Sequence, residues 1–374
     1  GPTKDAAVLE TSKCDTKEYL EEIGVPVPEY EIFDDSQEAK EWAEQWYDEH
    51  DVGLVPKADG IAAGKGAFVT SSLEDTKNAI DTIMGENFNE KYDGAGERIE
   101  IEERLEGDEL SFFAITDGET VKPFGTARDY KRRFGKEVSL IDKYFDGINP
   151  NTGGMGAYSP VVIDEELEQQ LMREIIEPTV QNLDRFERAD DEYRGVLHLV
   201  TMVTDEGPKV LEFNVRDGDP EAQARLPRLQ TDTYELFSSV TDQTLNEIEM
   251  KWSDEDCVAV CAVSGPPYKD HKRIGGGYPG NYQSKQPIFP TGNPDSRIGR
   301  EGIATHVRSM VYHNGTGLED SNGNEFIQSR GGRVLTITAT ADSFEEAREQ
   351  VYSDLDNVHF PYMAHRDDIA EEVA

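Results

Sequence analysis

The sequence predicts an α+β protein, in which both strands and helices contribute to the core. Residues 195–203 (GVLHLVTMV) and 333–340 (RVLTITAT) are apolar runs rich in β-branched side chains, which are typical of strands. Residues 73–84 (LEDTKNAIDTIM) instead carry apolar side chains at helical spacing. The chain has 374 residues, which is enough for two or three domains with buried cores.

The composition is strongly acidic. Asp and Glu number 77 against 37 Lys and Arg, a formal net charge of −40. Such a charge repels nucleic acid and anionic membranes, so we expect neither as a partner. It is typical of a solvated surface adapted to high salt, where screening shortens the range of the self-repulsion. We therefore expect a halophilic protein.

Cysteine content and hydropathy bear on the compartment. Cys14, Cys257 and Cys261 do not make a disulfide framework, and the last two lie in an apolar run that predicts inert core thiols. Neither a signal peptide nor an apolar run of about 18 residues is found, so we expect a soluble, cytoplasmic protein, and a monomer. The chain begins Gly-Pro-Thr rather than Met, which predicts a fragment.

The elements follow from caps and periodicity. A helix is predicted over 15–23, with Asp15 or Thr16 as its cap and Gly24 as its stop signal. The later elements are predicted from apolar period and from the Gly, Pro, Asn and Asp residues that flank it. They are expected, in chain order, as a strand at 53–60, a helix at 73–84, strands at 98–105 and 109–116, a long loop at 130–150, a helix at 164–183 and a hairpin at 195–214.

Residues 253–374 predict a separate module. Its strands are expected near 257–263 and 333–340. Its helix begins after Ser343, which has Glu346 three residues later, the spacing of a capping box. The apolar stripe that we expect this helix to bury consists of Ala347, Val351 and Leu355.

The glycine-rich segment KADGIAAGKG, residues 57–66, resembles a phosphate cradle. It is no P-loop, because too few residues separate its glycines and Gly66 stands where Ser or Thr would hold Mg²⁺. Backbone N–H groups of a strand–loop–strand turn can still close over phosphates, with Lys57 and Lys65 adding charge. The alternative is a solvated turn between two strands.

The segment VLEFNVRDGDPEAQ, residues 210–223, combines a strand with oxygen ligands. Glu212 and Asn214 lie two residues apart, so they share one face of the strand. Mg²⁺ takes few protein ligands and completes its shell with nucleotide phosphates, which suits this pair. Arg216, two residues further, has the geometry to grip an anionic substrate. The alternative is a half-buried strand with polar residues facing solvent.

Two further segments are weaker signals. NPNTGGMGAYSP, residues 149–160, predicts a flexible loop whose N–H groups could hold a carboxylate or phosphate, or simply an ordinary turn. IEERLEGDELS, residues 101–111, could meet adenine through its backbone and ribose through Glu109, although most glutamates of so acidic a chain are solvated surface.

Taken together and in this order, these segments resemble the ATP-grasp ligases, and among them the phosphoribosylamine–glycine ligase family. The resemblance spans nearly the whole chain, and NTGGMGAYSP and EFNVRDGDPE are its most specific motifs. The other matching segments are GPTKDAAVLETSK, KADGIAAGKG, IEERLEGDELS, RDYKR, GGGYPGNY and GGRVLTITA.

The resemblance implies an ATP-grasp fold of two α+β lobes that clasp ATP, followed by a smaller α/β module. It places the first lobe, with the glycine-rich lid, at 1–104, the second at 105–240 and the C-terminal domain at 241–374. The implied ATP-binding residues are Lys57, Gly64, Lys65, Gly66, Glu102, Glu103 and Glu109, and the implied ligands of Mg²⁺ or Mn²⁺ are Glu212 and Asn214. The implied catalytic residues are Lys131, Arg216 and Asp219, and Arg216 is also among the implied substrate-binding residues, with Asp129, Asn151, Thr152, Gly153, Gly154, Met155 and Gly156.

The implied reaction ligates glycine to phosphoribosylamine. The glycine carboxylate attacks the γ-phosphoryl group of ATP, and the amine then displaces phosphate from the resulting glycyl phosphate. The alternatives are another ATP-grasp carboxylate–amine ligase, or a non-catalytic nucleotide-binding paralogue or truncated fragment.

The chain departs from the family pattern in several places. The resemblance implies a further N-terminal domain that helps to bind the ribose phosphate, and we expect this chain to lack it. Tyr130 replaces a histidine, extra residues precede Asn151, Pro56 precedes Lys57, and Asp217 replaces an aromatic residue. The changes at Tyr130 and before Asn151 bear on the acceptor site, whereas the implied ATP and metal residues are intact.

Overall fold

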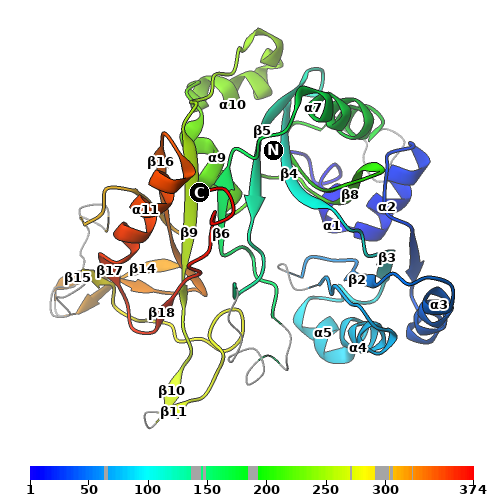
Figure 1. The fold of residues 1–374 in the computed structure, drawn as a ribbon, viewed down its shortest axis with the longest axis horizontal. Helices are drawn as coiled ribbons and strands as arrows, with labels where there is room; N and C mark the ends of the chain where they lie inside the picture. Colours follow the sequence, from blue (N-terminus) through cyan, green and yellow to red (C-terminus); the bar gives the residue numbers. More distant parts are fainter. Residues whose placement is uncertain are drawn as a thin grey trace. The chain divides into compact units, whose positions relative to one another are not determined.

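The computed structural model describes residues 1–62, 66–135, 145, 149–183, 193–269, 272–290, 303, 306–321 and 323–374. They form two compact units. The first comprises Gly1–Thr126, Val162–Asp217 and Asp232–Glu249, and the second Ala127–Val161, Gly218–Thr231 and Met250–Ala374. Strand β5 (Val121–Asp129) begins in the first unit and ends in the second (Figure 1). The predicted division into two ATP-grasp lobes and a C-terminal domain, with boundaries at residues 104 and 240, stays a prediction.

The first unit contains two sheets with helices on them. Its helices are α1 (Val8–Thr11), α2 (Lys13–Glu22), α3 (Ser36–Glu49), α4 (Leu73–Ile83), α5 (Glu86–Lys91), α7 (Glu165–Leu171), a π-helical turn at Met172–Ile176, α8 (Glu177–Gln181), α10 (Thr233–Asp242) and a 3₁₀ turn at Leu245–Glu247. Its strands are β1 (Tyr30–Phe33), β2 (Leu54–Ala58), β3 (Ile99–Glu103), β4 (Asp108–Thr116), β7 (Gly195–Thr204), β8 (Gly207–Asn214) and the start of β5.

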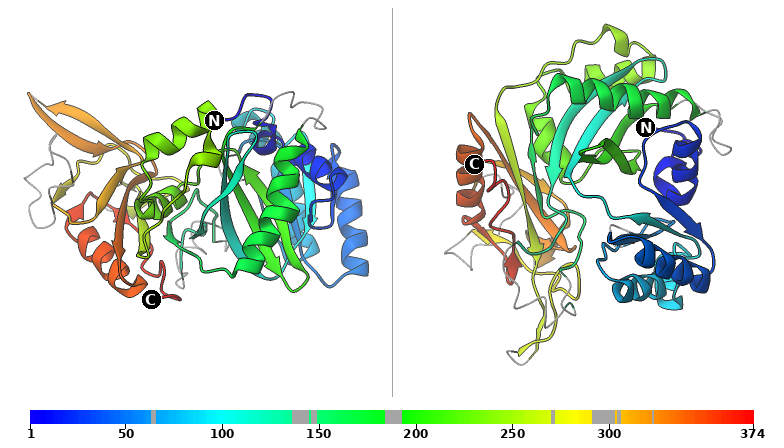
Figure 2. Two further views of the ribbon diagram at one scale, coloured as in Figure 1. Left: turned by 90° about the horizontal axis from the view of Figure 1, so that it is seen from above. Right: turned by 45° about the vertical axis from the view of Figure 1, so that its right-hand side comes forward.

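The smaller sheet has the antiparallel order β1-β3-β2. Helices α3, α4 and α5 lie on one face of it, as Figures 1 and 2 show. Ile99 and Ile101 of β3 are fully buried on this face, in one cluster with Ala43 and Trp46 of α3 and Ile80 of α4. The other face of β3 therefore carries the alternate residues, among them two glutamates.

The larger sheet of this unit is built on the predicted hairpin. Strands β7 and β8 pair over 195–214 around the DEGP turn, and β4 lies on the other side of β7. The first seven residues of β7 are buried, which explains why this strand reads as an apolar run rather than an alternation. The helix predicted at 164–183 is confirmed over α7 to α8, with the π-helical turn between them.

The second unit is a mainly antiparallel structure with few helices. Its helical elements are α9 (Glu221–Arg225), a 3₁₀ turn at Leu226–Arg228 and α11 (Phe344–Leu355). Its strands are β6 (Gly156–Ser159), β9 (Asp256–Ser264), β10 (Tyr268–Lys269), β11 (Lys272–Arg273), β12 (Phe289–Pro290), β13 (Met310–His313), β14 (Thr316–Ser321), β15 (Asn324–Ser329), β16 (Arg333–Ala341), β17 (Val358–His359), β18 (Met363–Ala364) and the end of β5.

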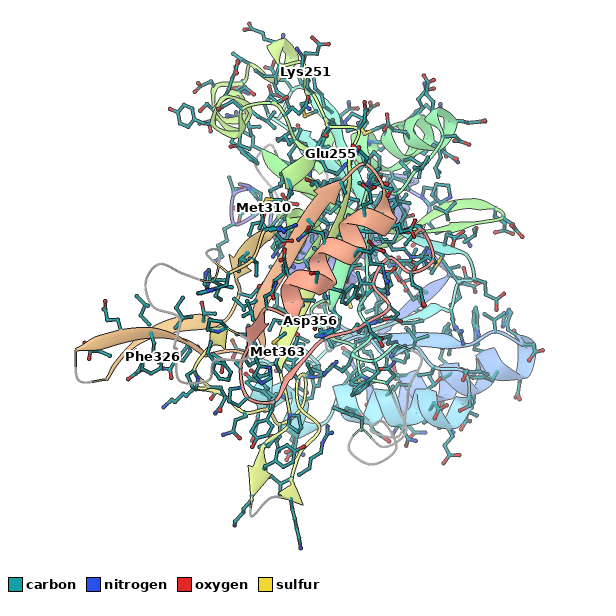
Figure 3. All side chains as sticks on the ribbon, turned by 60° about the vertical axis from the view of Figure 1, so that its left-hand side comes forward. Lys251, Glu255, Met310, Phe326, Asp356 and Met363 are labelled. Atoms are coloured by element: carbon teal, nitrogen blue, oxygen red, sulfur yellow. The ribbon has the colours of Figure 1, made fainter. Side chains whose placement is uncertain are left out.

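The core of this unit lies between helix α11 and the strand order β13-β16-β9-β6-β5. Figure 3 shows α11 lying along this sheet with Asp356 at its end, while the β14–β15 hairpin that carries Phe326 extends away from it. Ser343 Oγ accepts a hydrogen bond from the Glu346 backbone N–H at 3.3 Å, so the predicted cap is confirmed. The predicted stripe Ala347, Val351 and Leu355 is buried.

One predicted cap is wrong. Helix α2 begins at Lys13, and Ser12, rather than Asp15 or Thr16, is its N-cap, because Ser12 Oγ accepts from the Asp15 N–H at 3.1 Å. The same hydroxyl donates to Asp59 at 2.9 Å, a contact that no local pattern announces. Within the described part of the chain, no helix has both the length and the hydropathy to cross a bilayer.

Candidate functional site

Four charged side chains meet in the interior of the first unit. Glu100 and Glu102 lie two residues apart on β3, so they share the face opposite Ile99 and Ile101. Lys57 of β2 lies directly across from Glu100 in the antiparallel register. Lys17 reaches the same place from helix α2. All four are at least 94 % buried, with relative exposures of 1 to 6 %.

The ammonium groups share one carboxylate. Glu102 accepts from Lys17 Nζ at 2.8 Å through one oxygen and from Lys57 Nζ at 2.5 Å through the other. Glu100 lies 3.3 Å from Lys17 Nζ and 4.0 Å from Lys57 Nζ. Glu102 is therefore held most closely and Glu100 less so, and the cluster is neutral when both carboxyls are ionised.

These distances set the proton affinities. Burial raises the pKa of Glu100 to about 7, because Lys17 and Lys57 offset the desolvation only in part and Glu102 adds repulsion. Burial acts on Glu102 too, but the two lysines outweigh it and lower the pKa of that carboxyl. For Lys17, burial disfavours the charge, yet Glu100 and Glu102 together raise its pKa.

Glu100 should make stability fall as the pH rises from about 5 to 8. A carboxyl whose pKa is higher in the folded state binds its proton more tightly there, so its contribution is present at low pH and lost as the pH rises through about 7. The loss is on the order of 2 kcal/mol. In Glu100→Gln the free energy of unfolding at pH 5 and at pH 8 should differ less, by that amount, whereas the exposed Glu206→Gln should keep the wild-type difference. Equal pH dependence in Glu100→Gln and wild type would count against this assignment.

The cluster joins the predicted phosphate lysine to the predicted metal strand. Lys57 Nζ donates to the backbone carbonyl of Leu211 at 2.9 Å, and Lys17 Nζ to that of Val210 at 3.3 Å. Both carbonyls belong to β8, the strand that bears Glu212 and Asn214. The fold thus brings a residue of β2 to the strand of the predicted metal ligands.

The donor set at the end of β8 fits a hard divalent cation. Glu212 and Asn214 supply a carboxylate and an amide oxygen from one face of the strand. Asn214 Oδ1 accepts from Arg216 at 3.1 Å, and Arg216 also pairs with Glu10 at 2.9 Å. No group of three or more His, Cys, Asp or Glu is placed to hold a metal within the described ranges. Two oxygens beside phosphate are the kind of set that Mg²⁺ uses.

The glycine-rich segment leaves β2 and returns beside it. Lys57 forms a β-bridge with Ala67, and the Ala58 N–H donates to the Gly66 carbonyl at 2.8 Å. A Cβ on Gly66 would lie 2.9 Å from that of Ala62, so the turn is closed tightly by small residues. This is the strand–loop–strand form expected for a cradle. Gly64 and Lys65 lie outside the described residues, so their predicted contacts stay predictions.

The remaining predicted nucleotide residues lie near the ends of β3 and β4. Glu103 ends β3 and accepts from Lys209 Nζ at 3.0 Å and from the Glu29 N–H at 3.1 Å. Glu109 is half-buried on β4, opposite Met202 of β7. Glu102 faces Lys17 and Lys57, whereas Glu103 faces the other side of the strand, because consecutive side chains of a strand point to opposite faces.

In the second unit, the predicted glycine-rich loop pairs with the segment that follows β5. The Thr152 N–H and hydroxyl both donate to the Lys131 carbonyl, at 2.8 and 2.9 Å. The Met155 N–H donates to the Tyr130 carbonyl at 2.9 Å. The loop predicted at 130–150 is thus tied at both described ends, while most of its middle lies outside the described residues.

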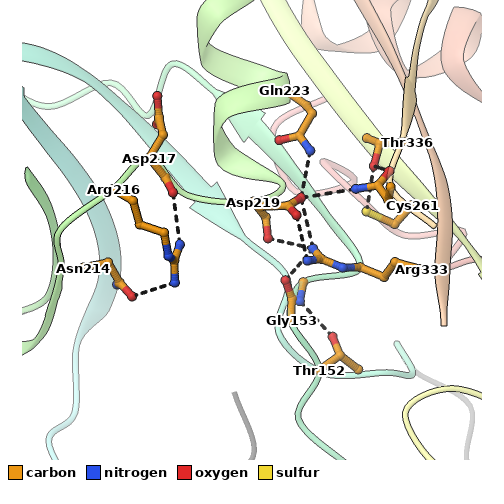
Figure 4. A network of polar contacts seen from close by, with 12 residues as sticks. Thr152, Gly153, Asn214, Arg216, Asp217, Asp219, Gln223, Cys261, Arg333 and Thr336 are labelled. Atoms are coloured by element: carbon orange, nitrogen blue, oxygen red, sulfur yellow. Dashed lines mark hydrogen bonds and ion pairs between the residues drawn. The ribbon is translucent and has the colours of Figure 1, made fainter. Parts of the chain in front are cut away.

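An arginine that sequence reasoning did not single out closes this loop onto Asp219. Arg333 of β16 donates to the Gly153 carbonyl at 2.6 Å and to the Asp219 carbonyl at 2.7 Å, and pairs with the Asp219 carboxylate at 2.9 Å (Figure 4). A Cβ on Gly154, whose φ is +105°, would lie 2.8 Å from Asp129 Oδ1. Asp129, Gly153 and Asp219 are therefore neighbours around one guanidinium.

Two signals could have pointed to Arg333. It lies in the matching segment GGRVLTITA, and it is a lone cation at the start of an apolar strand. Burial disfavours its charge, but Cys261 and Asp219 beside it raise its pKa. Arg216, predicted to act with Asp219, belongs to the first unit, and Asp219 belongs to the second.

Comparisons with known proteins bear on the family of this chain. Residues 11–222 match the family model described as the phosphoribosylglycinamide synthetase ATP-grasp (A) domain, and residues 274–372 match the C domain of the same synthetase. A biotin carboxylase from Campylobacter jejuni shares the fold, with a TM-score of 0.62 at 14 % identity over 97 % of this chain and 70 % of the other. The family model and the fold thus define an ATP-grasp protein.

Similar proteins show to which family of ATP-grasp proteins the chain belongs. Phosphoribosylamine–glycine ligase from Archaeoglobus fulgidus is 43 % identical over 100 % of this chain and 79 % of its own length. The Caldanaerobacter subterraneus protein of that name is 35 % identical over 99 % of this chain and 78 % of its own. The crystal structure of the Thermotoga maritima ligase superposes with a TM-score of 0.74 at 26 % identity, over 99 % of this chain and 81 % of the other. The chain belongs to the phosphoribosylglycinamide synthetase family, as the motifs predicted.

Proposed function

We propose that the chain ligates glycine to 5-phosphoribosylamine in purine biosynthesis, consuming ATP and releasing glycinamide ribonucleotide, ADP and phosphate. Membership of the family supports this, since relatives matched over most of their length carry the name phosphoribosylamine–glycine ligase. The observation in the chain itself that supports it most is the contact of Lys57 with the carbonyl of Leu211, next to Glu212. This contact supports the proposal that Lys57 acts on phosphate beside the proposed metal ligands.

The first proposed step is phosphoryl transfer to glycine. A glycine carboxylate oxygen bonds to the γ-phosphorus while the bond from that phosphorus to the β–γ bridging oxygen breaks, which gives glycyl phosphate and ADP. Such a transfer needs mainly positioning and charge neutralisation. Lys57 and Lys65 would supply positive charge, and Glu103 and Glu109 would orient the adenosine. Glu212 and Asn214 would hold Mg²⁺ or Mn²⁺, which neutralises phosphate charge when it is bound.

The second proposed step is amide formation. The amine of phosphoribosylamine attacks the acyl carbon, the carbon–oxygen bond to phosphate breaks, and the amine loses a proton. Asp129, Lys131 and the loop 151–156 would hold the substrates. Arg333 would fix the loop, because its bonds to Gly153 and Asp219 leave neither free to turn away. Arg216 would bind substrate anions from the end of β8.

The surface charge supports a further proposal about conditions. A net charge of −40 destabilises a compact fold through self-repulsion unless salt screens it. We therefore propose that the enzyme is halophilic. We also keep the predictions from the sequence that it is cytoplasmic and a monomer as proposals.

One assay tests the function. ADP should form in molar KCl only when glycine and freshly generated phosphoribosylamine are both supplied, and far less should form in dilute buffer. ADP release that ignores glycine would contradict the ligase, and ADP release with glycine but another amine would favour a different ATP-grasp ligase, which the replacement at Tyr130 makes worth testing. Nucleotide binding without any turnover would favour the non-catalytic alternative.

A further inference from the structure

Tyr130 is tied to a segment more than two hundred residues away. Its hydroxyl donates to Glu372 Oε1 at 2.6 Å and accepts from the Ala370 N–H at 2.8 Å. The guanidinium of Arg366 lies over its ring, 4.9 Å from the centroid. Burial, and then the hydrogen bond to Glu372, raise the pKa of this phenol, so it stays a donor at any working pH. We call residues 366–372 the anchor segment.

The anchor segment is itself held firmly. Tyr352 of α11 donates to the Arg366 carbonyl at 2.9 Å and accepts from the Ile369 N–H at 3.2 Å. Arg348 of the same helix donates to the Ile369 carbonyl at 3.0 Å. Ile369 and Ala370 are fully buried in the core beneath α11. The segment can therefore serve as a fixed support for what it touches.

The anchor segment contacts the backbone of the segment after Tyr130 and the glycine that begins β6. Arg366 donates to the Arg132 carbonyl at 3.0 Å through Nη1, while its Nε and Nη2 pair with the Asp368 carboxylate, each at 2.7 Å. A Cβ on Gly156 would lie 3.0 Å from Ile369, and one on Gly135 only 2.2 Å from Asp368. The anchor segment thus packs against the chain just after Tyr130 and against the start of β6.

The contact at Tyr130 is on the face away from Asp129. In the register of β5 and β6, Arg128 lies opposite Tyr158 and Asp129 opposite Ala157. Tyr130 therefore lies on the same face as Tyr158, and Asp129 lies on the other face. Asp129 faces Gly154, in the arginine network described above. The anchor segment therefore holds Tyr130 on one face of the strand and leaves the face that carries Asp129 open.

We propose that Tyr130 is a positioning residue for the acceptor, which acts by fixing Asp129 and Lys131 through its hydroxyl bonds to Glu372 and Ala370. This rests on the proposed function. The anchor segment meets the hydroxyl at the end of the Tyr130 side chain.

The test compares Tyr130→Phe, which deletes only the hydroxyl, with wild type in the full chain. Because the lost hydrogen bond is to a charged group, the KM for phosphoribosylamine should rise about tenfold. The KM for ATP should stay within twofold, because the nucleotide residues lie on other strands. Tyr312→Phe, on β13 of the same unit, is the matched control and should leave every constant unchanged.

A double-variant cycle makes the test specific. Glu372→Ala should raise the same KM, and Tyr130→Phe combined with Glu372→Ala should be little worse than Tyr130→Phe alone, because Tyr130→Phe already removes the bond to Glu372. Additive effects, an unchanged KM in Tyr130→Phe, or an equal rise in the KM of all three substrates would overturn the proposal. Failure of the function would appear as wild type lacking glycine-dependent ADP formation. In that case hydrogen exchange of the Thr152 and Met155 amides would test whether Tyr130 fixes the loop. Exchange should be faster in Tyr130→Phe than in wild type, and equal exchange in the two would refute the proposal.

Discussion

Replacing Lys17 by methionine should destabilise the first unit by about 3–5 kcal/mol, because it leaves Glu100 and Glu102 buried with a single cation. Lys17 holds both carboxylates, at 3.3 and 2.8 Å, and water cannot replace it at this depth. The measurement is the denaturant midpoint of the first unit. The KM for ATP should rise as well, because Lys57 would then have to neutralise two carboxylates and would be less available to phosphate.

Two variants calibrate this result. Lys77→Met removes a lysine from the surface pair with Glu44, where the loss should be at most about 1 kcal/mol. Lys17→Met combined with Glu100→Gln restores neutrality and should recover most of the lost stability. If Lys17→Met were no more harmful than Lys77→Met, the buried cluster would not be the charged network that the distances indicate.

Replacing Glu212 by glutamine should lower kcat by about 10³-fold while nucleotide binding is largely kept. The change keeps the size of the side chain but removes the charge that would hold the divalent cation. Metal stabilisation of phosphate charge amounts to several kcal/mol, and each 1.36 kcal/mol is about a factor of ten in rate. The measurements are kcat from the coupled ADP assay and the dissociation constant of ATP.

The matched control is Glu206→Gln in the turn of the same hairpin, whose side chain is 82 % exposed. It should keep wild-type kcat. Unchanged turnover in Glu212→Gln would mean that the metal assignment is wrong, and loss of nucleotide binding together with turnover would assign Glu212 to the nucleotide rather than to the cation.

The site could be predicted where its residues share a local pattern. Glu212 and Asn214 fall on one face because strand side chains alternate, whatever packs around them. The hairpin that carries them and the helix begun by Ser343 were predicted for the same reason, and the structure confirms both. The turn of the glycine-rich segment was also predicted from the sequence, and the bridge between Lys57 and Ala67 shows that the chain comes back beside β2.

Other parts of the site depend on residues far apart in the chain. Lys17 bonds to Glu102 across 85 residues, Arg333 to Gly153 across 180, and Tyr130 to Glu372 across 242. Nothing in the local period of these segments distinguishes a glutamate that meets two lysines from one that meets water. The wrong cap of α2 has the same origin, since Ser12 is also bound by Asp59, 47 residues away.

The sequence by itself determined the family, the order of the main elements and the face on which the predicted metal ligands lie. Covalent geometry fixes the periods of strands and helices, so those features are legible residue by residue. The tertiary structure alone decided which charges pair, which residue caps α2 and what holds the loop that contains Gly153. Those choices depend on burial, because a carboxylate or guanidinium taken out of water must find its partner wherever the packed chain supplies one.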